Sequence, residues 1–130
     1  MGLTYADLKL TSLIQKKSLN IRSLVDTGAT FMCVTQAMAV QLGFDTEEVR
    51  TQTVTLADGS QKKVPKIAPI EIEFETATGV RSYVTEALVL GDEPLLGVLP
   101  LEAMDLIVDP RAQKLLPNPA NPNVPVALAK

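Results

Sequence analysis

The chain has 130 residues with 12 basic and 15 acidic side chains, a formal net charge of -3 and no histidine. One domain is expected at this length, because single domains most often have about 100–150 residues. The absence of histidine excludes imidazole-dependent triads, histidine acid–base chemistry and most zinc sites. Hydrolysis by this chain must therefore use carboxylates, hydroxyls or the lone thiol of Cys33.

Composition also limits the partners of the chain. The acidic balance, with a pI of about 4.9, and aromatic residues at only 4% argue against a nucleic-acid ligand, which needs basic contacts and stacking platforms. A single cysteine cannot form an internal disulfide, and no apolar run reaches the roughly 18 residues of a membrane span. We expect a soluble cytoplasmic protein without a membrane partner.

Apolar and polar residues alternate over most of the chain, which is typical of half-buried strands. The clearest segment, residues 70–75, places three apolar side chains on one face and three carboxylates on the other. The same pattern predicts further strands at residues 5–10, 19–25, 50–56, 80–89 and 106–108. Turn signals separate these segments, and Asp109-Pro110 is also predicted to be a turn.

Two short helices are predicted between the strands. Thr35 is suited to cap a helix that runs through Met38 to Leu42 and stops at Gly43, and Pro100 is suited to be the first residue of a helix continuing to Met104. Strands at this spacing with two short helices indicate an all-β fold, a small closed β-barrel. Residues 117–130 hold four of the nine prolines, so we expect a tail without regular structure.

The segment with the clearest chemical signal is Asp26-Thr27-Gly28-Ala29, which follows directly on the apolar strand segment 21–25. A carboxylate at the end of such a strand loses hydration unless something compensates for it. Gly28 allows a sharp turn and a close approach, and Thr27 provides a hydroxyl that can tie neighbouring loops together. Taken alone, the segment also fits an ordinary Asx turn.

Two later segments accompany this motif. Leu56-Ala57-Asp58-Gly59 lies between two strand patterns and reads as the tip of a hairpin. Leu95-Leu96-Gly97 is an apolar pair closed by glycine, directly before the second predicted helix.

In this order the three segments resemble the retropepsin-like aspartic proteases, over roughly residues 5–116. The resemblance implies a domain of residues 1–116 with the retropepsin fold and a flap hairpin, followed by the tail at 117–130. It implies that Asp26 is catalytic and acts with the equivalent aspartate of a second active-site loop. Thr27 then braces the two loops against each other, Gly28 keeps the two carboxylates coplanar, and Ala29 completes the loop. The resemblance gives Leu95, Leu96 and Gly97 a supporting role beneath this loop, and it implies no cofactor and no metal.

For the flap the resemblance implies that Leu56, Ala57, Asp58 and Gly59 cover a bound peptide, while a plain hairpin turn is the alternative. The chain departs from the viral pattern in two places. Residues 98–102 replace an arginine-asparagine helix, which places the chain nearer to the cellular and bacterial relatives, and the flap tip lacks aromatic residues.

Peptide hydrolysis by carboxylates needs two of them, and the chain offers one such aspartate. The second must come from another copy of the chain, so the resemblance implies a homodimeric aspartic endopeptidase acting on peptides or proteins. The alternative is a retropepsin-like domain that dimerises or binds peptides without cutting them, because a fold does not guarantee its activity.

The remaining conspicuous side chains are expected to be structural. Cys33 has no histidine or basic neighbour in the sequence to lower its pKa and is interpreted as a small buried hydrophobe. Lys62, Lys63 and Lys66 are interpreted as a solvated strand face. Core filling is the simplest role for three methionines, Met32, Met38 and Met104.

Overall fold

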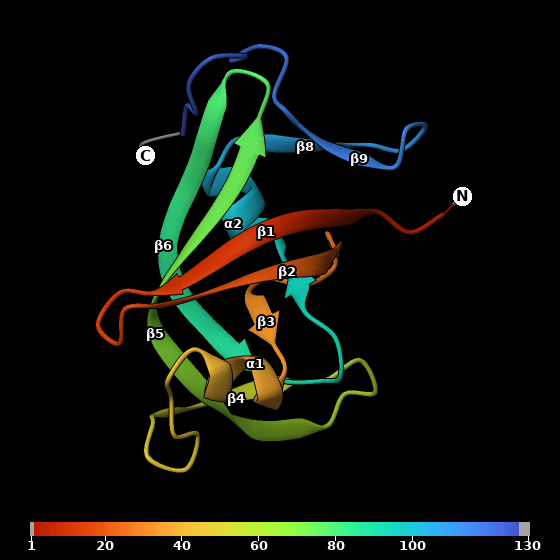
Figure 1. The fold of residues 1–130 in the computed structure, drawn as a ribbon. Coiled ribbons are helices and arrows are strands. Elements are labelled where there is room, and N and C mark those ends of the chain that lie inside the picture. The colour runs from red at the N-terminus through yellow and green to blue at the C-terminus, as the bar shows by residue number, and fades with distance from the viewer. Residues whose placement is uncertain (1, 128–130) are drawn as a thin grey trace.

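The computed structural model describes residues 2–127 (Figure 1). Its strands and helices follow in the order β1 (Tyr5–Ser12), β2 (Lys17–Val25), β3 (Met32–Val34), α1 (Gln36–Gln41), β4 (Thr51–Thr55), β5 (Gln61–Thr76), β6 (Gly79–Val89), β7 (Leu95–Leu96), α2 (Val98–Ala103), β8 (Leu106–Asp109) and β9 (Lys114–Pro117). Strands therefore dominate the fold, and the predicted all-β class with short helices is confirmed.

Seven strands form one sheet in the order β1-β2-β7-β3-β6-β5-β4, and β1 also pairs with β5. The pairings among β1, β2, β7, β3, β6 and β5 thus return to their starting strand and close a ring. One side of this ring consists only of the short strands β3 and β7, so it is a ring of strands and not the true barrel that the sequence suggested. Strands β8 and β9 form a separate two-stranded sheet.

The alternation seen in the sequence produces the core. In β5, Ile70 and Ile72 are fully buried, whereas the glutamates between and beyond them are partly or fully exposed. The main core cluster also contains Met32 and Met104, with no exposed surface, and Met38 packs against it from α1. The core role predicted for the three methionines is confirmed.

The first helix matches its predicted capping signals. The Met38 amide donates a hydrogen bond of 3.2 Å to Thr35 Oγ1, and Gly43, just after the helix, has a positive φ of 93°. The side-chain oxygen satisfies an amide that has no partner within the helix.

The second helix begins two residues earlier than predicted. Gly97 is its N-cap and Val98 its first residue, so Pro100 lies within the first turn and is not the first helical residue. Proline is tolerated throughout that turn, because these amides have no intrahelical acceptor. The amides of Val98 and Leu99 instead donate to the carbonyls of Ala29 and Thr30, at 2.8 and 3.0 Å.

The segment after β9 is attached to the body by a cluster of hydrogen bonds, although residues 118–127 contain no helix or strand. The Asp105 carboxylate accepts from Asn118 Nδ2 (3.0 Å), Asn121 Nδ2 (2.7 Å) and the Val126 amide (3.0 Å). The buried Arg81 guanidinium donates to the carbonyls of Met104, Asp105 and Asn121. We call this set of contacts the C-terminal clasp; it lies near the β5–β6 turn (Figure 1).

The predicted boundary between a domain at 1–116 and a tail at 117–130 stays a prediction, although β9 extends across it to Pro117. Asp109-Pro110 forms the predicted turn, in which Asp109 Oδ1 accepts from the Arg111 amide at 3.0 Å. Within residues 2–127, no helix is long and apolar enough to cross a membrane.

Candidate active site

Asp26 is the first residue after β2, and its backbone is fixed by the neighbouring strand. Its amide donates a 3.0 Å hydrogen bond to the Leu96 carbonyl, which continues the parallel pairing of β2 with β7. The Asp26 carbonyl accepts from the Ala29 amide at 3.1 Å, and the carboxylate Oδ1 accepts from the Gly28 amide at 2.9 Å. Asp26 is partly buried, while Thr27 and Gly28 are exposed. The loop thus has the Asx-turn geometry considered above and also presents one oriented carboxylate.

Leu95, Leu96 and Gly97 lie directly against this loop. Leu96 is fully buried, and Leu95 pairs with both Leu24 and Cys33. At Gly97 a Cβ atom would lie 2.7 Å from the carbonyl carbon of Thr30 and 2.8 Å from the Ala29 oxygen. These are backbone atoms that cannot give way cheaply, so glycine is required for the close approach of the two segments.

The β4–β5 hairpin is the predicted flap. Its tip closes with hydrogen bonds from the Gly59 amide to the Leu56 carbonyl (2.9 Å) and from the Leu56 amide to the Ser60 carbonyl (2.8 Å). Gly59 has a positive φ of 86°. The Asp58 carboxylate accepts hydrogen bonds from the amide and the hydroxyl of Ser60. These hydrogen bonds lower the pKa of the Asp58 carboxyl. Ala57, Asp58 and Gly59 are exposed. Asp58 thus organises the turn itself.

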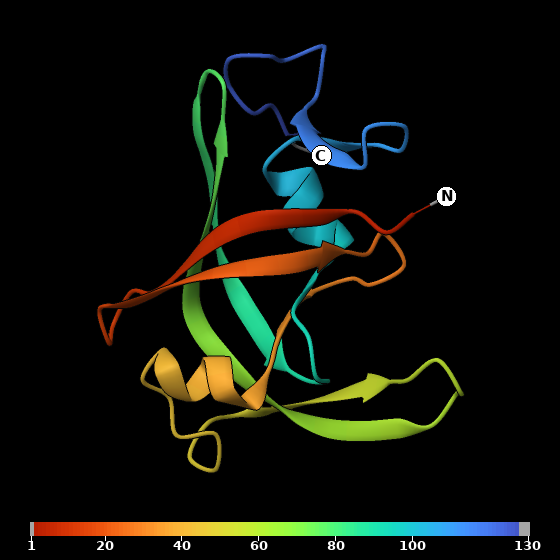
Figure 2. The same ribbon diagram turned by 45° about the vertical axis from the view of Figure 1, so that its right-hand side comes forward.

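The flap and the Asp26 loop lie on the same side of the molecule (Figure 2). A small apolar cluster connects them, which we call the cleft cluster. It consists of buried Cys33, Val64 and Leu88, with partly buried Val54, Leu90 and Leu95 packed against them. It brings side chains from the flap strands together with the strands that support Asp26.

Cys33 is buried, as predicted, and its surroundings do not activate it. Burial raises the pKa of its thiol, and the negative charge of Asp26 raises it further. A thiol with a raised pKa is a poor nucleophile at neutral pH.

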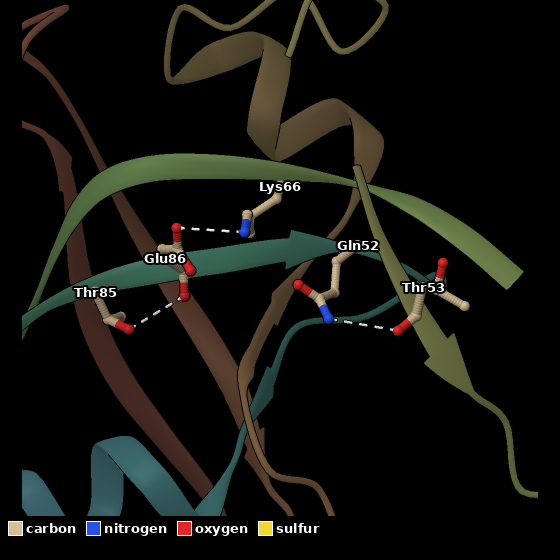
Figure 3. Close-up of polar contacts among 5 residues, drawn as sticks. All are labelled: Gln52, Thr53, Lys66, Thr85 and Glu86. Atoms are coloured by element: carbon tan, nitrogen blue, oxygen red, sulfur yellow. Dashed lines mark hydrogen bonds and ion pairs between the residues drawn. The ribbon is translucent and has the colours of Figure 1, made fainter. Parts of the chain in front are cut away.

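The basic residues of the flap differ from one another. Lys62 and Lys63 are exposed, as expected for a solvated face, but Lys66 is not. Its side chain is 21% exposed and its ammonium lies 3.5 Å from the Glu86 carboxylate on β6 (Figure 3). The prediction of a solvated face is therefore wrong for Lys66.

The structure brings together Asp26, its loop and the Leu95–Leu96 strand, and places the flap tip across from them. Sequence analysis did not predict four members of the cleft cluster as site residues: Val54, Val64, Leu88 and Leu90. Val54, Val64 and Leu88 belong to three different strands and Leu90 directly follows β6, so only the register of pairing reveals their proximity. A cavity of about 820 Å³ lies elsewhere, between β1, β2, β5, β6 and β9, and none of its lining residues belongs to the flap tip or the Asp26 loop.

Comparisons with known proteins agree with this geometry. Residues 12–103 match the family model described as "gag-polyprotein putative aspartyl protease". No curated protein sequence gives a significant match.

Two solved structures are similar in fold. A retropepsin-like aspartic protease from Rickettsia conorii has 26% identity and a TM-score of 0.54, covering 83% of this chain and 85% of its own. The retroviral protease-like domain of Ddi1 from Leishmania major has 15% identity and a TM-score of 0.56, covering 95% and 94%. At 15% identity the second similarity concerns the fold alone.

The family match spans most of the chain and includes the Asp26 loop, the flap and the Leu95–Gly97 segment. The ring of strands, the hairpin on the same side of the molecule as the aspartate loop and the glycine-dependent contact beneath that loop are consistent with that match. This chain belongs to the gag-polyprotein aspartyl protease family and has the retropepsin-like fold.

Proposed function

We propose that the protein is a homodimeric aspartic endopeptidase that cleaves extended peptides, with one Asp26 from each subunit at a shared active site. The observation that carries this proposal is the oriented carboxylate of Asp26 at the end of β2. The backbone amide of Asp26 donates to the Leu96 carbonyl, its carboxylate accepts from the Gly28 amide, and the loop lies on the same side of the molecule as the flap. The similarity in fold to the retropepsin-like aspartic protease from Rickettsia conorii supports the proposal.

The chemistry requires two carboxyl groups. Two carboxylates about 4 Å apart repel each other by about 4 kcal/mol at an effective dielectric constant of about 20, so the pair retains one proton, as is established for aspartic-protease dyads. The ionised carboxylate takes a proton from a water molecule, whose oxygen attacks the peptide carbonyl carbon. The protonated carboxyl donates its proton to the carbonyl oxygen. In the collapse of the tetrahedral intermediate, the carboxyl that took the water proton donates it to the leaving nitrogen and the C–N bond breaks. The other, now ionised, carboxylate takes a proton back from a hydroxyl of the intermediate as the carbonyl forms again, which restores the singly protonated pair.

The second carboxyl group has to come from a partner chain, because the sequence contains one Asp-Thr-Gly segment. A two-fold axis would pass between the two Asp26 loops and place the exposed Thr27 side chains near each other. Thr27 would then brace the two Asp26 loops against each other, and Gly28 would keep the two carboxylates coplanar. Residues 56–59 of each flap would cover the peptide.

The direct test is the substitution Asp26→Asn, which removes the ionisable group with little change in size. We expect cleavage of a mixed peptide library, read by mass spectrometry, to fall to background while circular dichroism and the unfolding midpoint stay close to wild type. A pepstatin-type inhibitor should suppress the wild-type products. Undiminished cleavage by Asp26→Asn would overturn the assignment.

The alternative proposal is a domain that dimerises or binds peptides without cutting them. The intact Asp26-Thr27-Gly28 segment favours the enzyme, because a binding module has no need for an oriented carboxylate beside its flap. Peptide binding by the wild-type chain with no cleavage product would favour the alternative.

The cytoplasmic location stays a prediction, to be tested by fractionation.

A further inference from the structure

The two faces of the flap differ, and strand pairing determines which side chain lies on which face. Directly opposed residues of an antiparallel pair lie on the same face, and successive residues alternate. Val54 is opposite Lys62, and Gln52 is opposite Val64. One face therefore carries Gln52, Val54, Lys62 and Val64. Figure 3 shows the Gln52 and Thr53 side chains on opposite sides of β4.

The face that carries Val54 and Val64 is turned toward the candidate active site. Both residues belong to the cleft cluster, together with Cys33 and Leu95. Leu95 directly precedes Leu96, whose carbonyl holds the Asp26 amide, and Cys33 lies close enough to Asp26 for that charge to raise its thiol pKa. The burial pattern of β4 agrees, because Gln52 and Val54 are partly buried while Thr51, Thr53 and Thr55 are exposed.

Lys62 lies on this same face, one pleat nearer to the flap tip than the buried Val64. Its side chain is beyond the cleft cluster and remains exposed. Neither of the two ion pairs found among residues 2–127 involves Lys62, since they join Arg22 to Asp7 and Lys66 to Glu86. Lys63, its neighbour, has the opposite orientation and belongs to the outer face with Thr53, the residue it pairs with.

We infer that Lys62 is a specificity-determining residue: the Lys62 of each subunit selects, at the substrate position under its own flap, an acidic side chain over its neutral equivalent. The inference rests on the proposed function, because it assumes that a peptide lies between the flap and the Asp26 loop. The expected contact is a charge-assisted hydrogen bond from the lysine ammonium to a glutamate or aspartate carboxylate.

Other charges oppose acidic side chains elsewhere in the peptide. Asp58 is exposed at the flap tip, and Asp26 lies at the candidate active site. We expect these two carboxylates to disfavour acidic residues at the peptide positions next to them. A peptide that is acidic throughout is therefore not the expected substrate.

The test compares peptides that differ only by Glu or Gln at one position, with each position around a cleaved bond examined in turn. Wild type is expected to cleave the Glu peptide with a kcat/KM about two- to fivefold higher than that of the Gln peptide at the positions under the two flaps, one on each side of the cleaved bond, which is the range of an exposed ion pair. Lys62→Gln should bring this ratio to about one. Lys63→Gln, which removes the same charge from the adjacent residue on the outer face, should leave the ratio unchanged. Raising the salt concentration should lower the wild-type ratio.

The same peptides bound to Asp26→Asn protein provide a readout that needs no cleavage. The ratio of Kd values for the Gln and Glu peptides should depend on Lys62 and not on Lys63. Equal ratios in wild type, Lys62→Gln and Lys63→Gln, or equal losses in both lysine variants, would overturn the inference. Absence of cleavage by wild type together with a Lys62-dependent Kd ratio would instead contradict the proposed catalysis and leave the role of Lys62 supported.

Discussion

Gly97 supports the aspartate loop because it has no side chain. The hydrogen bonds from Val98 and Leu99 to the carbonyls of Ala29 and Thr30 hold the two segments at a separation that has no room for a Cβ atom. The sequence could predict a structural role for this glycine from its position after an apolar pair. The sequence could not identify the carbonyl groups that Gly97 contacts, because they lie about 70 residues away along the chain.

We predict that Gly97→Ala lowers the free energy of unfolding by about 1–3 kcal/mol, the usual cost of overpacking, and strongly reduces cleavage. Chemical denaturation followed by circular dichroism measures the first effect. Gly79→Ala is the control, since a Cβ there meets no atom within 4 Å and the cost comes only from its φ of 134°. A Gly97→Ala variant as stable as wild type would contradict this account of the contact.

Cys33 provides a second test at the residue scale. Its raised thiol pKa and its burial leave little thiolate at neutral pH, so the thiol should have no part in catalysis. We predict that Cys33→Ala retains most of the cleavage activity and that iodoacetamide modifies native wild-type protein far more slowly than unfolded protein. A folded Cys33→Ala variant without activity would point to thiol chemistry in place of a carboxylate pair.

At the level of elements, the sequence predicted the alternating strands well and missed those without alternation. The strand β3 is buried at all three positions, between the main core and the cleft cluster, so its residues show no period of two. The strand β7 has only two residues, and β9 is a short segment whose partner is β8. Such strands are determined by their neighbours in the fold and not by local pattern.

The strand β5 is much longer than the predicted segment 70–75, which lies within its second half. Pro65 and Pro69 lie within β5. The pairing of β5 with β6 shifts register between Ile67 and Ile70, and Pro69 lies within that irregularity, where a regular ladder hydrogen bond is not required. The sequence alone gives no sign that the chain continues as one strand through such a shift.

The C-terminal clasp leads to a prediction about acid stability. Hydrogen bonds from Asn118, then from the Val126 amide and Asn121, with the charge of Arg81, hold the pKa of the Asp105 carboxyl below its usual value. A lowered pKa in the folded state means that the carboxylate stabilises the fold above the unfolded-state pKa of about 3.9, and that this contribution disappears as the pH falls through the lower folded-state value.

We therefore expect Asp105→Asn to be less stable than wild type at neutral pH, with the difference shrinking in acid. Asparagine retains the size of the side chain and tolerates the positive φ of 55° at this position, so the substitution isolates the carboxylate. Urea unfolding at a series of pH values measures the difference. Asp109→Asn, at the last residue of β8, is the control and should cost less. A pH-independent difference for Asp105→Asn would contradict the role given to its charge.

For the whole molecule, the proposed dyad determines how activity depends on pH. Because two carboxyls share one proton and the chain has no histidine, kcat/KM should follow a bell-shaped profile with a mildly acidic optimum. Activity is lost in acid when both carboxyls are protonated and in alkali when both are ionised. A profile that rises steadily to alkaline pH would be incompatible with the shared proton.

The proposed homodimer rests on a single count, one aspartate motif where two carboxyls are needed. The monomer fold could be predicted from strand patterns and motifs, but a dimer contact would involve surfaces that no pattern in one chain identifies. Specific activity should fall on dilution, because association follows mass action. Thr27→Ala should shift this fall to higher protein concentration, as expected if the two hydroxyls brace the loops. Analytical ultracentrifugation over the same concentrations links the loss of activity to the monomer.

The most direct test of the shared active site is to mix wild-type chains with Asp26→Asn chains in equal amounts and allow the subunits to exchange. If each site needs one Asp26 from both chains, only wild-type pairs cleave, and random pairing leaves about one quarter of the activity of the same total amount of wild type. Chains that each cleave independently would leave about one half, and that result would contradict the account.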